Sequence, residues 1–280
     1  MRNKGTGLRK TFLNFASIIS NTIAIMSRHS FILSALLLFF GVCTAAAQNS
    51  TSAPVGLVFI GNSITYGALL ESPSTQAPPI ITAQLIRQQT GNDVYIKNCG
   101  LSGSTTYDWL PSTSLLQRAI DAARAYKGNG SLWFSIMLGT NDSAEKGPKG
   151  SPVSPANYKH NMQLIIDTLH ALFPEAHFLI NYPIWYSPTT HNGAIYLQAG
   201  LNRLQSYFPD IKALVKENRK RGIAIVQGNK KAFNFFRGKN NLFTTEQGHS
   251  GLFYLHPNKE GTVELATFWA ESLMRELKKD

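Results

Sequence analysis

The sequence predicts an α/β fold with a parallel sheet, and three observations lead to that prediction. Short runs made almost wholly of apolar residues recur between residues 55 and 226, which is typical of strands buried on both faces. The longer segments between these runs carry apolar residues at the spacing of amphipathic helices. Strands and helices alternate along the chain, and this alternation favours a parallel sheet covered by helices on both faces.

The first expected strand covers residues 55–60, a continuous apolar run that ends at Gly61. Glycine after such a run indicates a tight turn at the end of the strand. Four further apolar runs are expected to complete a sheet of about five strands, and they lie at 94–96, 132–138, 177–180 and 223–226.

Helices are expected in the intervals between the strands and after the last one. The clearest helical spacing is shown by six apolar residues of one segment, namely Tyr158, Met162, Ile165, Ile166, Leu169 and Leu172. The other expected helices cover 77–90, 112–126, 195–206, 208–220 and a last segment that begins at about 259. No internal repeat or linker divides the chain, so residues 48–280 are expected to form one domain.

The N-terminal segment has the pattern of a secretory signal peptide. Residues 1–47 contain five Lys or Arg and no Asp or Glu, and the apolar run from Phe31 to Val42 is followed by small residues. That run is shorter than the roughly 20 residues that a membrane-spanning helix needs. We expect cleavage after Ala47, with Met26 as an alternative start of the signal. The mature protein is then expected to be exported, periplasmic or secreted, with no stable membrane span.

Charge and motifs argue against several classes of partner. The chain has a net charge of +11, but residues 48–280 contain 22 basic and 16 acidic residues, a net charge of only +6. The basic residues are expected to form a solvated face, and no nucleic-acid-binding motif is present. No Walker loop, His-Glu-x-x-His motif or paired Cys-x-x-Cys occurs, so no nucleotide, metal or other cofactor is indicated. Cys99 is expected to be a buried, inert thiol.

Four residues that suit hydrolytic chemistry lie at the ends of expected elements. Ser63 follows the first strand, Gly103 the second and Asn141 the third, while His256 lies directly before the last helix. Each residue alone is typical of an ordinary turn or helix cap. Ligands of parallel sheets bind beyond the carboxyl ends of the strands, so the four together indicate a site at that edge.

These segments, in this order, resemble the four blocks of the SGNH (GDSL-type) hydrolase family. The matching segments are Gly-Asn-Ser-Ile-Thr around Ser63, Leu-Ser-Gly-Ser-Thr-Thr around Gly103, Gly-Thr-Asn-Asp around Asn141, and His-Pro-Asn from His256. The resemblance covers nearly all of residues 48–280. It implies a three-layer α/β/α, flavodoxin-like domain, with Ser63 as nucleophile and His256 as general base. It also implies an oxyanion hole made by the N–H groups of Ser63 and Gly103 and the side chain of Asn141.

The sequence departs from the family pattern at two positions. Asn62 stands where the family commonly has Asp, which is expected to be tolerated because this residue is not the nucleophile. Phe253 stands where the family usually has the Asp that orients the histidine. Three substitutes remain open: a backbone carbonyl near Phe253, a carboxylate such as Glu246 or Glu260, or no third member. We favour a dyad of serine and histidine in which the backbone carbonyl orients the histidine. Glu246 is the second choice for this role.

Aromatic residues after the fourth strand suggest where a substrate would bind. Tyr182, Trp185 and Tyr186 lie beyond the expected active edge of the sheet, with His191 a few residues further on. Aromatic rings beside polar groups suit the face of a sugar, although ordinary packing would produce the same pattern.

The function expected from these features is an exported serine ester hydrolase that removes short acyl groups, such as acetyl, from carbohydrates. Its substrate would then be a small-molecule or glycan ester. A lysophospholipase or thioesterase acting on longer acyl chains is the alternative within the same class. A non-catalytic glycan-binding protein of the same fold is the alternative from a different class, and Phe253 is the feature that motivates it.

Overall fold

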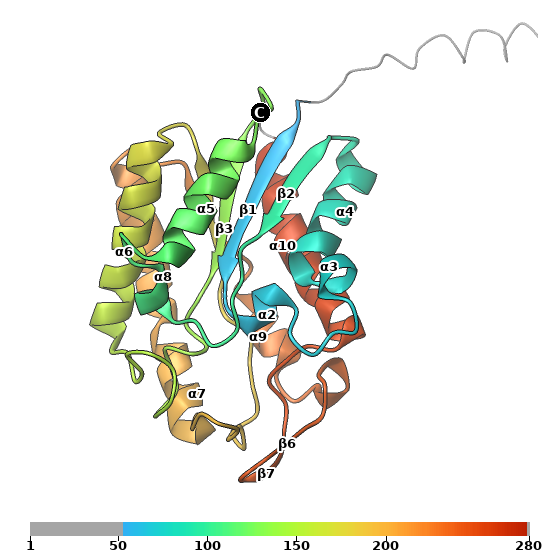
Figure 1. Ribbon diagram of the computed structural model, residues 1–280, viewed down its shortest axis with the longest axis vertical. Coiled ribbons are helices and arrows are strands. Elements are labelled where there is room, and N and C mark those ends of the chain that lie inside the picture. The colour runs from blue at the N-terminus through green and yellow to red at the C-terminus, as the bar shows by residue number, and fades with distance from the viewer. Residues whose placement is uncertain (1–52, 279–280) are drawn as a thin grey trace, which may run out of the picture. The chain divides into compact units, whose positions relative to one another are not determined.

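The computed structural model describes residues 53–278, and its centre is a sheet of five parallel strands in the order β2-β1-β3-β4-β5 (Figure 1). The strands are β1 Val55–Gly61, β2 Val94–Asn98, β3 Leu132–Met137, β4 His177–Ile180 and β5 Ile225–Gln227. Each strand begins and ends within two residues of its expected position, which confirms the predicted fold class. The expected signal peptide lies outside the described residues.

Helices cover both faces of the sheet, which gives three layers (Figure 1). One face carries α4 Pro78–Thr90 and α10 Lys259–Leu277, and the other carries α5 Ser114–Ala125, α6 Pro155–Leu172 and α8 Phe208–Lys220. The remaining helices are shorter and lie in the connections: α2 Ser63–Tyr66, α3 Pro73–Gln76, α7 Leu197–Ser206 and α9 Lys231–Phe236. Within residues 53–278, no helix combines the length and apolar character that a membrane crossing requires.

The strand register brings the candidate residues to one edge. In the pairing of β1 with β3, Gly61 lies beside Met137, so the connections after both strands leave the sheet side by side. On the other side of β1, Phe59 pairs with Asn98 at the end of β2. Because all these strands are parallel, the segments that carry Ser63, Gly103 and Asn141 start from the same edge of the sheet.

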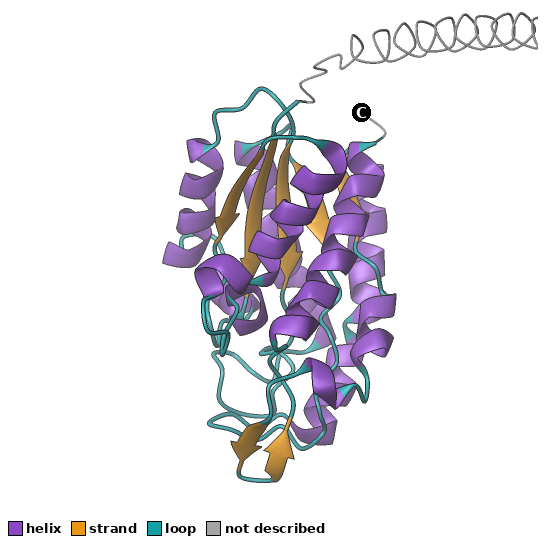
Figure 2. Cartoon of the chain, turned by 90° about the vertical axis from the view of Figure 1, so that its right-hand side faces the viewer, coloured by secondary structure: helices purple, strands orange, loops and turns teal. Residues whose placement is uncertain are grey.

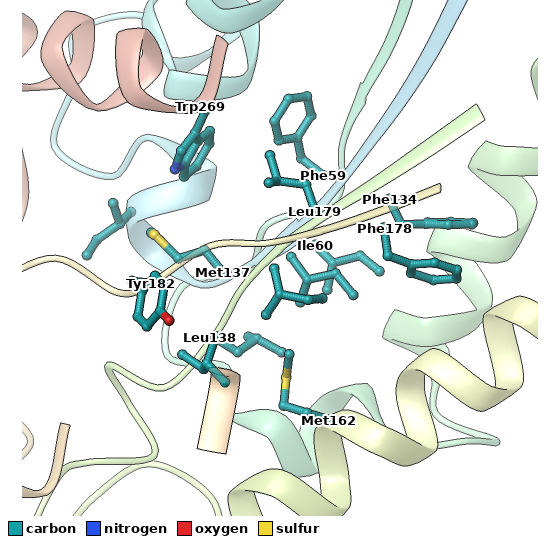
Figure 3. Close-up of a cluster of buried hydrophobic side chains, with 14 of the residues drawn as sticks. Phe59, Ile60, Phe134, Met137, Leu138, Met162, Phe178, Leu179, Tyr182 and Trp269 are labelled. Atoms are coloured by element: carbon teal, nitrogen blue, oxygen red, sulfur yellow. The ribbon is translucent and has the colours of Figure 1, made fainter. Parts of the chain in front are cut away.

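Large aromatic side chains fill the space between the sheet and its helices (Figure 3). Trp269 of α10 stacks on Phe59 of β1 with ring centroids 5.6 Å apart, and Phe134 stacks on Phe178 across β3 and β4 at 5.5 Å. All four side chains are buried. Complete burial of one such side chain contributes about 1.5–3 kcal/mol to folding, so the sheet edge rests on a firmly packed core.

A small antiparallel hairpin, which the sequence analysis did not expect, precedes the last helix. It consists of β6 Glu246–Gly248 and β7 Gly251–Phe253, and it projects at the far end of the described structure from its C-terminus (Figure 2). Its register places Glu246 directly opposite Phe253. At the tip, the backbone N–H of His249 donates to the carbonyl of His191 at 2.8 Å, which holds the hairpin against the connection after β4.

Candidate active site

Ser63 lies in a tight turn that the local sequence explains. The side chain of Asn62 caps the short helix α2 by accepting a hydrogen bond from the backbone N–H of Ile64 at 3.1 Å. The amide oxygen makes this cap as a carboxylate oxygen would, while the buried amide nitrogen of Asn62 has no hydrogen-bond partner among the described residues. A Cβ atom on Gly61 would lie only 2.0 Å from Oγ1 of Thr65, so the turn also requires glycine there.

His256 lies between Ser63 and Glu246 and contacts both. Its Nε2 is 3.0 Å from Oγ of Ser63, and its Nδ1 is 2.9 Å from Oε1 of Glu246. The carboxylate accepts only, so Nδ1 carries a proton and Nε2 is left to accept the hydroxyl proton of the serine. The side chains of His256 and Glu246 are 11% and 15% exposed. This arrangement has the geometry of an acid, a base and a nucleophile in series.

The favoured expectation of a backbone carbonyl near Phe253 is therefore wrong, because Glu246 occupies the position beside Nδ1. The reason is the hairpin: the residue that faces Phe253 across the two strands is Glu246, and it supplies the carboxylate from the opposite strand. The phenyl ring of Phe253 is buried instead. Glu260, the other carboxylate considered, lies exposed in the first turn of α10.

The three expected oxyanion-hole residues lie together with His256 around one pocket of about 430 Å³. Gly103 has a φ of +78°, a backbone conformation that favours glycine and that sets the direction of its N–H group. The side-chain nitrogen of Asn141 donates to the carbonyl of Ser104 at 2.9 Å, which fixes the amide beside the Gly103 turn. The structure thus brings Ser63, Gly103, Asn141 and His256 to one place.

Most of the rest of the pocket wall comes from the connections after β3 and β4, which pair with each other. The backbone N–H of Glu145 donates to the carbonyl of Ile195 at 2.6 Å, and the N–H of Ile195 donates to the carbonyl of Lys146 at 2.9 Å. The side chains that line the pocket beyond the four residues above are mostly small: Ala68, Ser102, Gly147, Pro148, Asn192, Gly193, Ala194, Tyr196 and Leu255.

The model of the GDSL-like lipase/acylhydrolase family matches residues 59–262, which include all of the site residues just described. The chain belongs to this family. It is accordingly a carboxylic ester hydrolase, and the resemblance drawn from the sequence blocks is confirmed. No curated protein sequence matches the chain.

Solved structures of other acylhydrolases share the fold at low sequence identity. The carbohydrate acetylesterase Est24 from Sinorhizobium meliloti has a TM-score of 0.55 and 16% identity, over 79% of this chain and 98% of that one. A variant of Axe2, an acetyl xylan esterase from Geobacillus stearothermophilus, has a TM-score of 0.53 and 19% identity, over 79% and 94% of the two chains. The aryl esterase of M. smegmatis has a TM-score of 0.53 and 16% identity, over 79% of this chain and 99% of that one.

Asp142 is a buried carboxyl group of the acylhydrolase that sequence reasoning did not single out. Its Oδ1 accepts hydrogen bonds from both the backbone N–H and the hydroxyl of Thr106, at 2.9 and 2.5 Å. Burial raises the pKa of Asp142 to about 6, although the hydrogen bonds from Thr106 act in the opposite direction. Since Asn141 holds Ser104 and Asp142 holds Thr106, the connection after β3 fixes the segment that follows Gly103.

The residues expected to contact substrate lie elsewhere in the acylhydrolase. Tyr182, Trp185 and Tyr186 are buried and do not line the pocket, and Tyr182 belongs to the core cluster (Figure 3). The hydroxyl of Tyr186 lies 2.9 Å from Oγ of Ser143, inside the protein. His191 contacts the hairpin tip through Ser250, at 3.1 Å, and is also outside the pocket lining. Ordinary packing therefore explains the aromatic pattern.

The pocket residues that sequence reasoning missed come from the connection after those aromatic residues. Asn192, Gly193, Ala194 and Tyr196 line the pocket just beyond His191. The expected substrate residues lie at the aromatic start of this same connection, because aromatic rings indicate sugar binding more visibly than a short stretch of small residues. No spacing or motif in the sequence distinguishes Tyr196 from the buried tyrosines before it.

Proposed function

We propose that this acylhydrolase is an exported serine esterase that removes short acyl groups, acetyl above all, from carbohydrates through an acyl-enzyme on Ser63. The observation that carries the proposal is the pair of contacts of His256, at 3.0 Å to the hydroxyl of Ser63 and at 2.9 Å to the carboxylate of Glu246. Both distances lie within the range over which a base takes a proton and an acid orients that base.

In the first half of the reaction, Nε2 of His256 takes the hydroxyl proton while Oγ of Ser63 attacks the ester carbonyl. Glu246 holds the imidazole in the required tautomer and stabilises the imidazolium that forms. The carbonyl oxygen becomes an oxyanion, which receives hydrogen bonds from the N–H groups of Ser63 and Gly103 and from the amide of Asn141. When the tetrahedral intermediate collapses, the imidazolium gives its proton to the leaving sugar hydroxyl.

In the second half, a water molecule attacks the ester carbon of the acyl-enzyme. Nε2 of His256 takes a proton from that water, and the same three donors stabilise the second oxyanion. Collapse breaks the bond between Oγ and the acyl carbon, and the imidazolium returns its proton to Oγ. The products are the free carboxylic acid and the enzyme in its starting state.

The preference for a short acyl group rests on the pocket. Beyond the four residues of the site, small residues predominate in its lining, with Leu255 and Tyr196 as the large side chains. The similar structures that are described as a carbohydrate acetylesterase and an acetyl xylan esterase support an acetylated sugar as substrate. Export is proposed from the basic, apolar and small-residue pattern of residues 1–47.

Replacement of the nucleophile tests the reaction. In Ser63→Ala, kcat for p-nitrophenyl acetate is expected to fall by about 10⁴-fold or more, since no other hydroxyl contacts Nε2 among the described residues. Ser74→Ala is the matched control, because Ser74 is an exposed serine of α3. Unchanged hydrolysis by Ser63→Ala would show that the reaction uses another nucleophile.

Acyl preference is tested separately, with p-nitrophenyl acetate, butyrate and palmitate. The proposal predicts that kcat/KM is highest for acetate and falls along the series. A maximum at palmitate would favour the lysophospholipase or thioesterase alternative. The non-catalytic alternative has lost the feature that motivated it, because Glu246 supplies the carboxylate that Phe253 lacks.

A further inference from the structure

We propose that Tyr196 is a positioning residue for the oxyanion hole, whose hydroxyl holds the Asn141 carboxamide with its N–H group toward the reacting carbonyl. The hydroxyl of Tyr196 donates to Oδ1 of Asn141 at 2.7 Å, and Tyr196 also lines the pocket. The proposal rests on the proposed function, because it assigns a role in stabilising the oxyanion formed on attack by Ser63.

Two partners hold the two ends of this carboxamide. The carbonyl of Ser104 only accepts hydrogen bonds, so the nitrogen of Asn141 must face it, as the distance of 2.9 Å indicates. The oxygen then faces the hydroxyl of Tyr196. A flipped amide would place its oxygen against the carbonyl oxygen of Ser104. Both atoms are acceptors, so no hydrogen bond could form between them. With one N–H donated to Ser104, the second N–H of Asn141 remains for the oxyanion.

The hydroxyl of Tyr196 is suited to remain a donor throughout the working pH range. Its side chain is only 3% exposed, and burial, together with the nearby charge of Glu246, raises its pKa well above the ordinary value for tyrosine. The phenol therefore stays protonated. Donation to Oδ1 also polarises the carboxamide, which makes its N–H groups stronger donors.

The surroundings of Tyr196 fix the direction of its ring. Its edge meets the ring of Tyr186 at a centroid distance of 5.5 Å, and Tyr186 is itself hydrogen-bonded to Ser143. The preceding residue, Ile195, is paired with Glu145 and Lys146 in the connection after β3, and the N–H of Tyr196 donates to the carbonyl of Thr190 at 3.2 Å. The hydroxyl is thus set by packing and backbone pairing before substrate binds.

Tyr196→Phe tests the role, because it removes the hydroxyl and keeps the ring. We expect kcat for p-nitrophenyl acetate to fall about tenfold while KM changes less than about twofold, since the lost contact acts on the transition state. Tyr207→Phe is the matched control: its hydroxyl is also buried and donates to a backbone carbonyl, that of Val153, at 2.7 Å. That variant is expected to keep the wild-type kcat.

A double-mutant cycle separates positioning from general structural damage. Asn141→Ala should lower kcat about 100-fold, and adding Tyr196→Phe to it should cause no further loss, because the hydroxyl acts only through the Asn141 amide. A full wild-type kcat in Tyr196→Phe, or losses that multiply in the double variant, would overturn the proposal. If Ser63→Ala keeps full activity, the proposed function fails instead, and the two failures are therefore distinguishable.

A measurement on the wild type covers the case in which Tyr196→Phe does not fold. The hydroxyl proton of Tyr196, when donated to Oδ1 of Asn141 in a buried site, should exchange slowly and give a separate proton resonance by NMR. A cross-peak from that proton to the Asn141 side-chain amide, absent in Asn141→Ala, is the expected result. A rapidly exchanging hydroxyl without that cross-peak would contradict the assignment.

Discussion

Glu246→Gln is the substitution that examines the proposed acid most sharply, because it keeps the size of the side chain and removes its charge. In the wild type, Nδ1 of His256 lies 2.9 Å from Oε1 of Glu246. The imidazole becomes an imidazolium when it takes the serine proton, so the carboxylate is needed most in the transition state. The substitution should therefore lower kcat and leave KM nearly unchanged.

The size of the effect follows from the distance and the burial. Two unit charges with centres about 4 Å apart interact by about 4 kcal/mol at an effective dielectric constant of about 20. Each 1.36 kcal/mol corresponds to a factor of about ten in rate, which would give roughly a thousandfold loss. The side chains of Glu246 and His256 are 15% and 11% exposed, so solvent screens part of this interaction. We expect a loss in kcat of about 100-fold.

The assay is steady-state hydrolysis of p-nitrophenyl acetate at a fixed pH between 7 and 8. Glu260→Gln is the matched control, because it removes a carboxylate that is close in sequence but exposed on α10. It should retain the wild-type kcat. A kcat for Glu246→Gln within threefold of the wild type would refute the assignment of Glu246 as the acid.

Three further predictions concern stability and the turn at the site. Because burial raises the pKa of Asp142 to about 6, this group stabilises the fold fully below its unfolded pKa of about 3.9, and the contribution is lost as pH rises through about 6. About 2 kcal/mol of this contribution is lost between pH 4.5 and 7.5, so Asp142→Asn should flatten the decrease in Tm over that range. An equal decrease in both proteins would count against this. Trp269→Ala removes a buried ring that stacks on Phe59 and should lower the free energy of unfolding by about 3–5 kcal/mol, measured by urea denaturation. A change under 1 kcal/mol would contradict the packing described. Gly61→Ala places a Cβ 2.0 Å from Oγ1 of Thr65, so it should lower kcat more than tenfold or prevent folding. A fully active, stable variant would show that the turn tolerates a side chain.

The fold was predictable from the sequence because its strands are unusually apolar. The run that became β1 is buried along its whole length, so it lacks the alternation of a half-exposed strand and indicates a parallel sheet directly. The same topology explains the grouping of Ser63, Gly103 and Asn141, since parallel strands end at one edge. No comparable signal marks α2 or α9, whose 4 and 6 residues are too short to show helical spacing.

The sequence named Glu246 as a candidate third member but could not place it ahead of the backbone carbonyl. Its strand has three residues and pairs with another of three, and such segments carry no hydrophobic period. Its position opposite Phe253 is set by hairpin register, which depends on a turn rather than on a motif. The family position three residues before His256 falls on Phe253 of β7, whereas the carboxylate comes from β6.

The aromatic residues after β4 show a different limit. Tyr182 and Tyr186 lie at the expected edge of the sheet, and the sequence does not reveal whether a ring near that edge points into the pocket or the core. In the structure all three rings are buried, but of these Tyr196 is the one that lines the pocket and contacts the Asn141 amide. The difference arises from tertiary packing alone.

The acyl-enzyme on Ser63 is the central claim, and mass spectrometry of the trapped intermediate tests it most directly. Rapid acid quenching during turnover of p-nitrophenyl acetate should give protein that is heavier by one acetyl group, with the added mass on the peptide that contains Ser63. The mass increase should be absent in Ser63→Ala and retained in Ser74→Ala. An acetyl group found on another residue, or one that persists in Ser63→Ala, would contradict the account.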